Sequence, residues 1–226
     1  MRVAAIVPEY GGDIEATESR LQPLVDEVVI VNNNIDNRLF TKAINEGIEQ
    51  CNADIYWIVN NDVLPDPHCV EAAVNCFVEQ GIGQTGIVGS QNRLQSDMDY
   101  ITWGGSYQAY PAGRHKSGRV SKGELQQRTQ ETWITFASAF VNANVIRDIG
   151  LLDENMRHIG SDSDYCYRAR QAGYKCYHEP KSIVYHEPGT SHSTSNQWLQ
   201  SVMQADMLCW ERKWVYRCWD QIERTR

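Results

Sequence analysis

The side chains best suited to chemistry follow a short apolar run in the first third of the chain. Ile55–Val59 is β-branched and aromatic, and Asn60-Asn61-Asp62 comes directly after it. A run of this length and composition predicts a buried central strand that ends at the edge of a sheet. Ligands of open α/β sheets bind beyond the carboxyl ends of the strands, so Asp62 is a candidate ligand-binding carboxylate. The alternative is that an aspartate here only caps the helix begun by Pro67, and we expect this of Asp66.

Alternating strand and helix patterns must position these side chains. We predict strands at Arg2–Val7, Glu27–Val31, Ile55–Val59 and Ile87–Gly89, and helices at Ile14–Leu24, Leu39–Glu49 and Pro67–Glu79. Repeated βα units imply a parallel sheet with helices on both faces. Because such crossovers are right-handed, the ends of the first three strands lie at the same edge. Three polar segments therefore meet there: Pro8-Glu9-Tyr10, Asn32-Asn33-Asn34 and Asn60-Asn61-Asp62.

The pattern changes after Ser90. Residues 104–131 are rich in glycine and polar side chains and predict a long loop or hairpin. A segment of this kind is either a lid or binding loop, or a solvated hairpin without a ligand. Further on we predict a strand at Trp133–Phe140, helices at Asn144–Ile149 and Ser161–Ala172, strands at Tyr174–His178 and Ser182–His186, and a helix from about Asn196 onward.

Composition excludes several classes of protein. The chain has 226 residues and a formal net charge of -8, which argues against a nucleic-acid-binding protein, because the footprint of such a protein is basic. Seven scattered cysteines suit reduced thiols rather than a disulfide framework. No apolar run has the length of a signal peptide or a membrane span, so we expect a soluble, cytoplasmic protein. The length suits one domain over residues 1–226.

Six stretches of the sequence resemble one known family. They are VAAIVPEY, VVIVNNN, AINEGI, DIYWIVNND, GLLDENMRHIGSDSDYCYRARQAGY and VYHEPGTSH, in this order. Together they resemble the family 2 glycosyltransferases with a GT-A fold, above all the rhamnosyltransferase-like members of bacteria and viruses. The resemblance is most specific in Gly150–Tyr174, which is similar to the family pattern G-L-F-D-E … E-D-x-D-L-C-x-R-x-R-x-x-G-Y without needing a gap.

The resemblance implies a fold and an activity. The fold would be α/β, with a mostly parallel, Rossmann-like sheet flanked by helices, a small antiparallel extension and a C-terminal helix. Residues 1–100 would bind the nucleotide sugar, 101–192 would hold the acceptor and the catalytic residues, and 193–226 would form a helical segment. The activity would be inverting transfer of a hexosyl or deoxyhexosyl group from a UDP-, GDP- or dTDP-sugar to a glycan or lipid-linked acceptor. This activity would place the chain in polysaccharide biosynthesis, with at most peripheral membrane contact.

Transfer of this kind needs a group that stabilises the diphosphate as it leaves. A protein with a net charge of -8 does not neutralise the diphosphate by its average field, whereas a bound divalent cation does. In the family a strand-end D-x-D supplies the ligand, and here only Asp62 of Asn60-Asn61-Asp62 keeps a carboxylate. His186 stands where several GT-A enzymes place a histidine near the metal, and its alternative is a structural role at a strand end. An imidazole ligand would favour Mn²⁺ over Mg²⁺.

The resemblance also assigns a general base. Asp162 corresponds to the aspartate of the family's E-D pair, and Asp164 to the acidic position two residues further on, while Ser161 replaces the glutamate. Asp162 would take the proton of the acceptor, and Ser161 and Asp164 would contact the acceptor. If Ser161 caps the helix, the helix dipole favours the ionised form of Asp162. The alternative is that all three residues only cap and charge a helix start.

The first two strand ends would bind the donor nucleotide. Pro8-Glu9-Tyr10 resembles the family's V-P-x-Y-N region, and Asn32 stands where the family commonly has an aspartate. Asn60-Asn61 could hydrogen-bond the ribose or the phosphate. Asn45 and Gly47 resemble the family's A-x-N-x-G helix beside the donor, and helix packing is an equal alternative for both.

Two other functions fit parts of the pattern. A non-catalytic GT-A module that binds a sugar nucleotide or glycan is favoured by Asn32, Asn60 and Ser161, which replace acidic residues of the family. A nucleotidyltransferase is disfavoured, because the first strand lacks the Gly-rich, basic loop that grips a triphosphate. An apolar stripe near the C-terminus predicts docking on the core, and a membrane-surface or oligomer face is its alternative. The stripe consists of Trp198, Val202, Cys209, Trp210 and Trp214.

Overall fold

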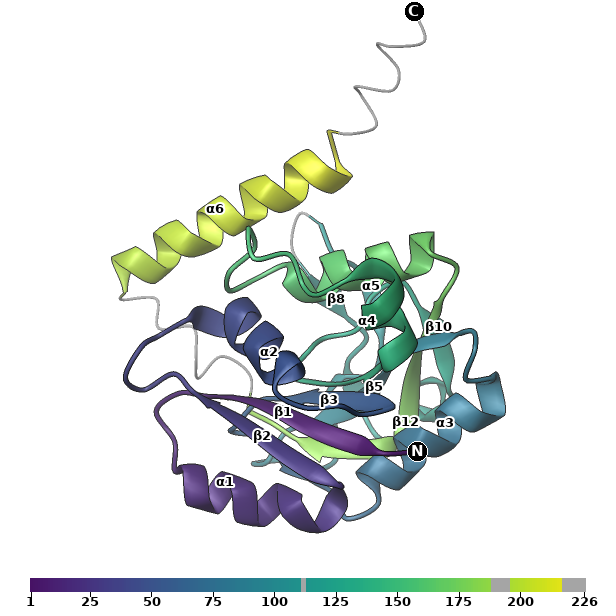
Figure 1. Cartoon of the computed structure of the whole chain (residues 1–226). Coiled ribbons are helices and arrows are strands. Elements are labelled where there is room, and N and C mark those ends of the chain that lie inside the picture. Colours follow the sequence, from purple (N-terminus) through teal and green to yellow (C-terminus); the bar gives the residue numbers. More distant parts are fainter. Residues whose placement is uncertain (111–112, 188–195, 217–226) are drawn as a thin grey trace, which may run out of the picture.

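A β-sheet with helices on both faces forms the centre of the protein (Figure 1). The computed structural model describes residues 1–110, 113–187 and 196–216. Within them the strands are β1 (Val3–Glu9), β2 (Glu27–Asn32), β3 (Ile55–Val59), β4 (Leu64–Pro65), β5 (Thr85–Arg93), β6 (Tyr100–Trp103), β7 (Ser106–Gln108), β8 (Arg114–His115), β9 (Gly118–Arg119), β10 (Thr129–Glu131), β11 (Ser138–Asn142) and β12 (Lys175–Tyr185). The helices are α1 (Ile14–Leu21), α2 (Leu39–Glu49), α3 (Cys69–Gln80), α4 (Ala143–Ile149), α5 (Ser161–Gln171) and α6 (Gln197–Trp214).

The sheet combines parallel and antiparallel pairs. Ten of the described strands form one sheet, and seven of them follow the order β10-β12-β5-β11-β3-β1-β2. β1 pairs in parallel with both β2 and β3, as the repeated βα units predict. β11 runs antiparallel between β3 and β5, so antiparallel pairing reaches the middle of the sheet and is more than a small extension. The α/β class is confirmed, with a mixed sheet.

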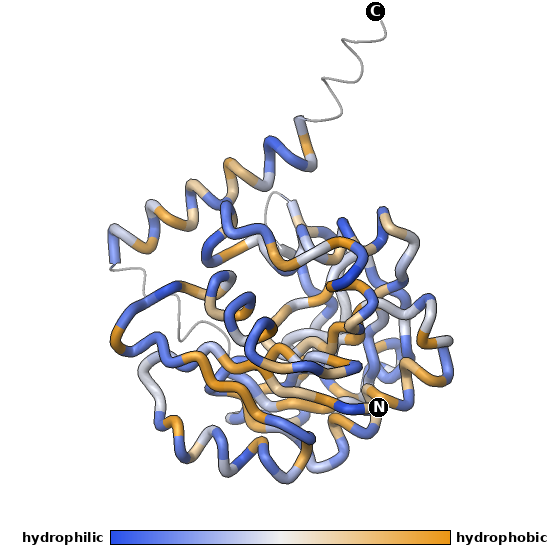
Figure 2. The backbone as a smooth tube through the Cα atoms, in the orientation of Figure 1, coloured by the Kyte–Doolittle hydropathy of each residue, from blue (hydrophilic) through white to orange (hydrophobic). Residues whose placement is uncertain are grey.

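Two apolar cores lie on the two faces of the sheet. Successive residues of β1 point to opposite faces, so Ala4 and Ile6 belong to one core, while Val3, Ala5 and Val7 belong to the other. The first core lies under α2, α4 and α5, and the second under α1 and α3. Figure 2 shows apolar residues gathered on the central strands. Each fully buried Ile or Val stabilises the fold by about 1.5–3 kcal/mol relative to an exposed one, and this burial holds the strand ends in place.

Two strands are longer than the sequence predicts. β5 extends the predicted Ile87–Gly89 at both ends. β12 is one strand in place of the two predicted at Tyr174–His178 and Ser182–His186. It stays paired with β5 through a register shift between Glu179 and Ile183, because an irregularity of this kind accommodates extra residues without ending a strand.

The strand predicted at Trp133–Phe140 begins only at Ser138. Trp133, Ile134 and Phe136 are buried in the first core from an irregular segment. Their apolar pattern therefore reflects burial rather than strand pairing, and periodicity does not separate the two for a short run.

The turn before α3 differs from the expectation that Asp66 caps a helix begun by Pro67. The helix begins at Cys69, and its N-cap residue is His68. Asp66 Oδ1 accepts from the His68 N–H at 3.0 Å, so Asp66 closes the turn that precedes the helix. Helix α1 is also shorter than the predicted Ile14–Leu24. It ends at Leu21, and a 3-10 turn at Gln22–Leu24 follows it.

The described residues of the segment 104–131, which are 104–110 and 113–131, form short strands and turns rather than one open loop. Lys116 Nζ bonds Glu131 Oε1 at 2.7 Å, and Arg119 Nη1 bonds Asp97 Oδ2 at 2.6 Å. Glu131 is buried and also accepts from the N–H and the hydroxyl of Ser106. These contacts anchor the segment and favour the hairpin alternative for the part that the structure describes.

Helix α6 lies across the face that carries α2 and α5 (Figure 1). Asn196 caps the helix by accepting from the Leu199 N–H at 3.2 Å. Leu199 and Val202 pack on Leu39. Of the predicted apolar stripe, Val202 and Trp210 are buried on the body of the protein, whereas Trp198 is 54% exposed. Among the described residues no helix combines the length and the apolar character that crossing a bilayer requires.

Candidate active site

The polar ends of β1, β2 and β3 lie at one edge of the sheet. Glu9 is the register partner of Asn32 across β1 and β2, and Ile6 is the partner of Ile58 across β1 and β3. The parallel register therefore brings the three polar segments together, as their order in the sequence predicts. The Gly11 N–H donates to Asn34 Oδ1 at 2.6 Å and links the first two segments.

Asn61 ties the third strand end to the first. Its Nδ2 donates to Glu9 Oε1 at 2.6 Å and to the Tyr10 carbonyl at 3.2 Å. Its own carbonyl accepts from Arg20 Nη2 at 2.6 Å. Pro8 and Glu9 are buried, whereas Tyr10 is 62% exposed. Glu9 and Asn61 therefore form an internal hydrogen-bonded unit, and Tyr10 is the side chain of the first segment that a ligand can reach.

Asp62 and His186 meet at the same edge from two distant parts of the chain. Asp62 Oδ1 lies 3.4 Å from His186 Nε2, and the two side chains are 32% and 12% exposed. His186 directly follows β12, which pairs with β4 through Tyr185 and Leu64. This pairing places the two predicted metal ligands side by side.

The Asp62–His186 pair offers one carboxylate and one imidazole to a cation. Both side chains are partly exposed, so the oxygen atoms of a bound diphosphate would have access to the open side of such an ion. In the part of the chain that the structure describes, no three His, Cys, Asp or Glu side chains are grouped around a possible metal position. The donor set fits a divalent cation shared between protein and ligand rather than one enclosed by protein.

Asn32 and its neighbours are held in a turn. Asn32 Oδ1 accepts from the Asn34 N–H at 2.9 Å, and the side chain of Asn32 is exposed at the sheet edge. Asn33 is buried, donates to the Leu39 carbonyl and accepts from the Arg38 N–H. Asn32 therefore remains accessible to a nucleotide, while Asn33 joins the turn to α2. Asn60 is partly exposed, and its backbone N–H donates to the Ala137 carbonyl.

Asn45 and Gly47 serve packing in this structure. Asn45 Nδ2 donates to the Leu152 carbonyl, and Asn45 Oδ1 accepts from the Leu152 N–H, both at 3.0 Å. A Cβ on Gly47 would lie 2.5 Å from Ile6 Cγ2, so glycine allows α2 to approach β1. The geometry favours the helix-packing alternative for both residues.

Asp162 lies in the first turn of α5, whose N-cap is Gly160 in the left-handed conformation, with φ 78°. Asp162 Oδ1 accepts from the Ser163 N–H at 2.7 Å, and the backbone of Phe136 also hydrogen-bonds the carboxylate. The expectation that Ser161 caps the helix is wrong. Gly160 takes that position, because its backbone adopts a φ that is strained for other residues.

Burial controls the charge of Asp162. Loss of hydration raises the pKa of this partly exposed carboxyl from 3.8 to about 6, although hydrogen bonds from the backbone of Ser163 and Phe136 lower it. We expected the helix dipole to dominate and favour the ionised form, and burial outweighs it. A carboxyl with a pKa near 6 is mostly ionised at neutral pH and is a stronger base than an exposed one, which suits a general base.

Asp164 is surrounded by protein. The side chain is fully buried, and its Oδ1 accepts from Trp214 Nε1 and Lys213 Nζ, each at 2.8 Å. Its Oδ2 accepts from Arg168 Nε at 3.0 Å. Both oxygens therefore serve the junction of α5 and α6. The predicted acceptor contact finds no support in this geometry, and neither does that of Ser161, which is 2% exposed.

The sequence did not reveal how α6 holds the segment that leads to Asp162. Asp206 is fully buried, and its Oδ2 accepts from the His158 N–H at 2.7 Å and from the Ile159 N–H at 3.1 Å. Trp210 Nε1 donates to Ser163 Oγ at 3.0 Å. One feature of the sequence could have indicated this contact. Asp206 lies one helical turn before Trp210 on the apolar face of α6, where a charge without a partner is unfavourable.

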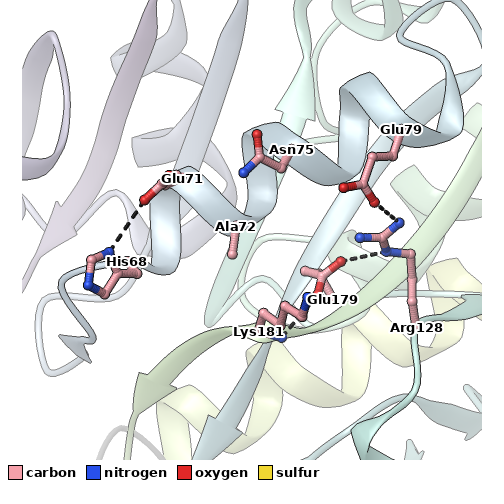
Figure 3. A pocket seen from close by; sticks show the side chains of 8 residues that line it. All are labelled: His68, Glu71, Ala72, Asn75, Glu79, Arg128, Glu179 and Lys181. Atoms are coloured by element: carbon pink, nitrogen blue, oxygen red, sulfur yellow. Dashed lines mark hydrogen bonds and ion pairs between the residues drawn. The ribbon is translucent and has the colours of Figure 1, made fainter.

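The groove in Figure 3 lies elsewhere, between α3 and β12. Its volume is about 190 Å³. Arg128 pairs with Glu79 and Glu179 in this groove, and His68 pairs with Glu71. None of the predicted site residues lines it, and these charges are paired with one another, so we assign no ligand to it.

Comparison with known proteins agrees with the resemblance seen in the sequence. A family model described as "Glycosyltransferase like family 2" matches residues 12–205. The pre-mycofactocin glycosyltransferases of Mycobacterium tuberculosis, strains CDC 1551 / Oshkosh and ATCC 25618 / H37Rv, are each 26% identical to this chain over 150 residues. The match covers 66% of this chain and 30% of each relative, so the chain spans less than a third of the length of these curated relatives.

Two solved structures share the fold. The structure of GalNAc-T7 with UDP, GalNAc and Mn²⁺ has a TM-score of 0.64 and 10% identity, and the match covers 90% of this chain and 48% of that one. The mannosyltransferase PcManGT from Pyrobaculum calidifontis, in complex with GDP-Man and Mn²⁺, has a TM-score of 0.58 and 14% identity, over 85% of this chain and 58% of that one. The predicted GT-A fold is confirmed.

Proposed function

The chain belongs to the family described as glycosyltransferase like family 2, and on this premise we propose that it transfers a sugar from a nucleotide-diphosphate donor to a hydroxyl group, with inversion. The observation that carries the proposal is the partly exposed Asp62–His186 pair at the strand edge, in which Asp62 Oδ1 lies 3.4 Å from His186 Nε2. The two structures of the same fold hold UDP, GalNAc and Mn²⁺, or GDP-Man and Mn²⁺. They support a nucleotide sugar and Mn²⁺ as ligands of this chain, with Mg²⁺ as the alternative.

Each part of the site has one task in the proposed reaction. Asp162 accepts the proton of the acceptor hydroxyl, whose oxygen attacks the anomeric carbon while the bond from that carbon to the diphosphate breaks. Asp62 and His186 would hold a divalent cation, which supplies Lewis-acid stabilisation of the leaving diphosphate. Tyr10 and Asn32, the accessible side chains of the first two strand ends, would contact the nucleoside.

The sugar and the acceptor follow from the resemblance to rhamnosyltransferase-like proteins. We infer a hexosyl or deoxyhexosyl donor carried on UDP, GDP or dTDP, and a glycan or lipid-linked acceptor, in cytoplasmic polysaccharide biosynthesis. A thermal-shift panel of these sugar nucleotides, each with and without Mn²⁺, tests the donor. Stabilisation by one nucleotide, increased by Mn²⁺, is the expected result. No response to any of them would favour a non-catalytic glycan-binding module, for which Asn32 and Asn60 in place of aspartates are the supporting observation.

Asp62→Ala is expected to weaken Mn²⁺ binding by at least about tenfold, because it removes the anionic ligand of the pair. Calorimetry or the EPR signal of free Mn²⁺ measures the affinity, in the presence of the nucleotide that stabilises the wild-type protein. Asp66→Ala is the matched control, since it removes the same charge from a nearby carboxylate that closes a turn. Equal weakening in both variants would mean that net charge, rather than ligation, explains the effect.

The pH dependence of transfer should report the ionisation of Asp162. Its pKa is about 6, and the base must be ionised to accept a proton. We therefore expect kcat/KM to rise about tenfold per pH unit below this value and to level off above it, since kcat/KM follows groups of the free enzyme. The midpoint should stay the same with Asp62→Ala enzyme at saturating Mn²⁺. A profile that is flat between about pH 5 and 8 would exclude Asp162 as the base.

A further inference from the structure

The side-chain amide of Asn61 has one permitted orientation at the strand edge. Its Nδ2 has two partners, Glu9 Oε1 at 2.6 Å and the Tyr10 carbonyl oxygen at 3.2 Å. A carboxylate and a carbonyl accept hydrogen bonds, so the NH₂ end of the amide must face them. The amide oxygen, Oδ1, is therefore the end that faces away from Glu9.

Several contacts hold this orientation. Arg20 Nη2 donates to the Asn61 carbonyl at 2.6 Å and fixes the backbone. Glu9 is fully buried, so its carboxylate does not turn toward water. Gly12 lies directly against the pair, because a Cβ there would be 2.3 Å from Glu9 Oε1 and 2.7 Å from Asn61 Nδ2. Exclusion of water strengthens a hydrogen bond to a charged acceptor.

Packing does not account for the burial of the second carboxylate oxygen of Glu9. Among the described residues, Glu9 Oε2 is buried and has no hydrogen-bond partner. Leaving a buried acceptor without a partner costs about 1–3 kcal/mol, so a carboxylate is not the most stable choice at this position. Buried polar atoms that lack a hydrogen-bond partner concentrate at functional sites.

We propose that Glu9 is a positioning residue that presents Asn61 Oδ1, as a hydrogen-bond acceptor, to the nucleoside part of the donor. The proposal rests on the proposed function and deepens it. An amide oxygen attracts a hydroxyl or N–H group and repels a phosphate oxygen. At the end of β3, Asn61 thus binds the nucleoside part of the donor, and Asp62 would hold the cation that binds the diphosphate.

Exchanging the two functional groups tests the proposal. In Asn61→Asp a carboxylate faces Glu9, so the hydrogen bond is lost and like charges repel. In the double variant Glu9→Gln/Asn61→Asp the introduced amide donates to the introduced carboxylate, and the net charge equals that of the wild type. We expect the Kd of the stabilising nucleotide among UDP, GDP and dTDP, measured by calorimetry with Mn²⁺, to rise at least about tenfold in Asn61→Asp. The double variant should regain at least about threefold of this loss, because the contact with residue 9 is restored while the Tyr10 carbonyl, 3.2 Å from the wild-type amide, still faces a carboxylate.

A second variant disturbs the pair without changing a polar group. Gly12→Ala places a methyl group against Glu9 and Asn61, and the expected loss of nucleotide affinity is again at least about tenfold. Gly83→Ala is the matched control, because no atom lies within 4 Å of the added Cβ. Inorganic pyrophosphate, which lacks a nucleoside, should bind Gly12→Ala and wild type equally. Thermal denaturation of each variant first establishes that it folds.

The outcomes separate this proposal from the function on which it rests. Equal nucleotide affinity in the wild type and in all folded variants would overturn the role of Glu9 and leave the glycosyltransferase proposal intact. Failure of the double variant to regain affinity, or loss of pyrophosphate binding in Gly12→Ala, would also overturn it. If the wild type binds none of the three nucleotides, the proposed function fails and the role of Asn61 fails with it.

Discussion

Asp162→Asn is expected to lower the rate of sugar transfer by about 10²–10⁴-fold, the range over which general bases contribute. Asparagine has nearly the same shape and keeps the hydrogen bond from the Ser163 N–H, which is 2.7 Å long, but it does not take the acceptor's proton. Asp162 lies on α5 rather than at the strand ends, so the Kd of the donor should change by less than about threefold. Initial rates of transfer and calorimetry of donor binding measure the two quantities.

The same substitution is expected to stabilise the fold at neutral pH. Burial raises the pKa of Asp162 from 3.8 to about 6. Between these two values the native state binds more protons than the unfolded state, so stability falls as the pH rises, and the full penalty is present above about pH 6. Asparagine carries no such penalty. The melting temperature of Asp162→Asn should therefore exceed that of the wild type by about 2–6 °C at pH 7.5 and match it below about pH 4.

Asp97→Asn is the matched control for both measurements. The Asp97 side chain is 38% exposed and pairs with Arg119, so its substitution should change neither transfer nor the pH dependence of melting. Unchanged turnover in Asp162→Asn would contradict the assignment of the base. So would a loss of donor binding as large as the loss of transfer, because the carboxylate would then serve binding rather than proton removal.

Asp206→Ala is expected to lower the free energy of unfolding by about 2–4 kcal/mol. Asp206 is fully buried, and its carboxylate accepts from the N–H groups of His158 and Ile159. Alanine would leave both donors without an acceptor and remove the charge that faces Arg157, whose Nε lies 3.8 Å from Asp206 Oδ1. Denaturant unfolding monitored by tryptophan fluorescence measures the change.

The substitution should also reduce transfer, because residues 157–160 lead directly into the first turn of α5, which carries Asp162. We expect kcat to fall more than the affinity for the donor, since the strand ends are not touched. Asp206→Asn keeps one acceptor oxygen and should recover part of both losses. Asp36→Ala removes a carboxylate that is 78% exposed and serves as the control. A loss of stability below about 0.5 kcal/mol in Asp206→Ala would show that α6 does not hold this segment.

The βα half of the fold could be predicted from the sequence. A parallel strand that is buried on both faces is an uninterrupted apolar run, and Ile55–Val59 is recognisable as one without knowledge of its partners. The right-handed crossover rule then brings the polar strand ends together, which the pairing of Glu9 with Asn32 confirms. The start of α5 was likewise predicted at Ser161, although its cap was not.

The second half could not be predicted to the same degree, because long-range pairing decides it. Nothing local indicates that β11 enters between β3 and β5, or that one strand, β12, continues through a register shift. The apolar residues Trp133 and Ile134 indicate burial but not the partner that buries them. Contacts between distant segments override local preference at such positions.

By itself, the sequence determined the α/β class, the convergence of the strand ends, and Asp62 and Asp162 as the candidate carboxylates. Only the tertiary structure decided that His186 lies 3.4 Å from Asp62, that Asp164 turns inward to α6, and that Glu9 fixes the amide of Asn61. The physical reason is that each of these contacts joins residues far apart in the chain, or separate elements of the fold, and local patterns do not encode such contacts. Burial is likewise a property of the whole fold, and it raises the pKa of Asp162 to about 6 against the helix dipole that the local sequence indicates.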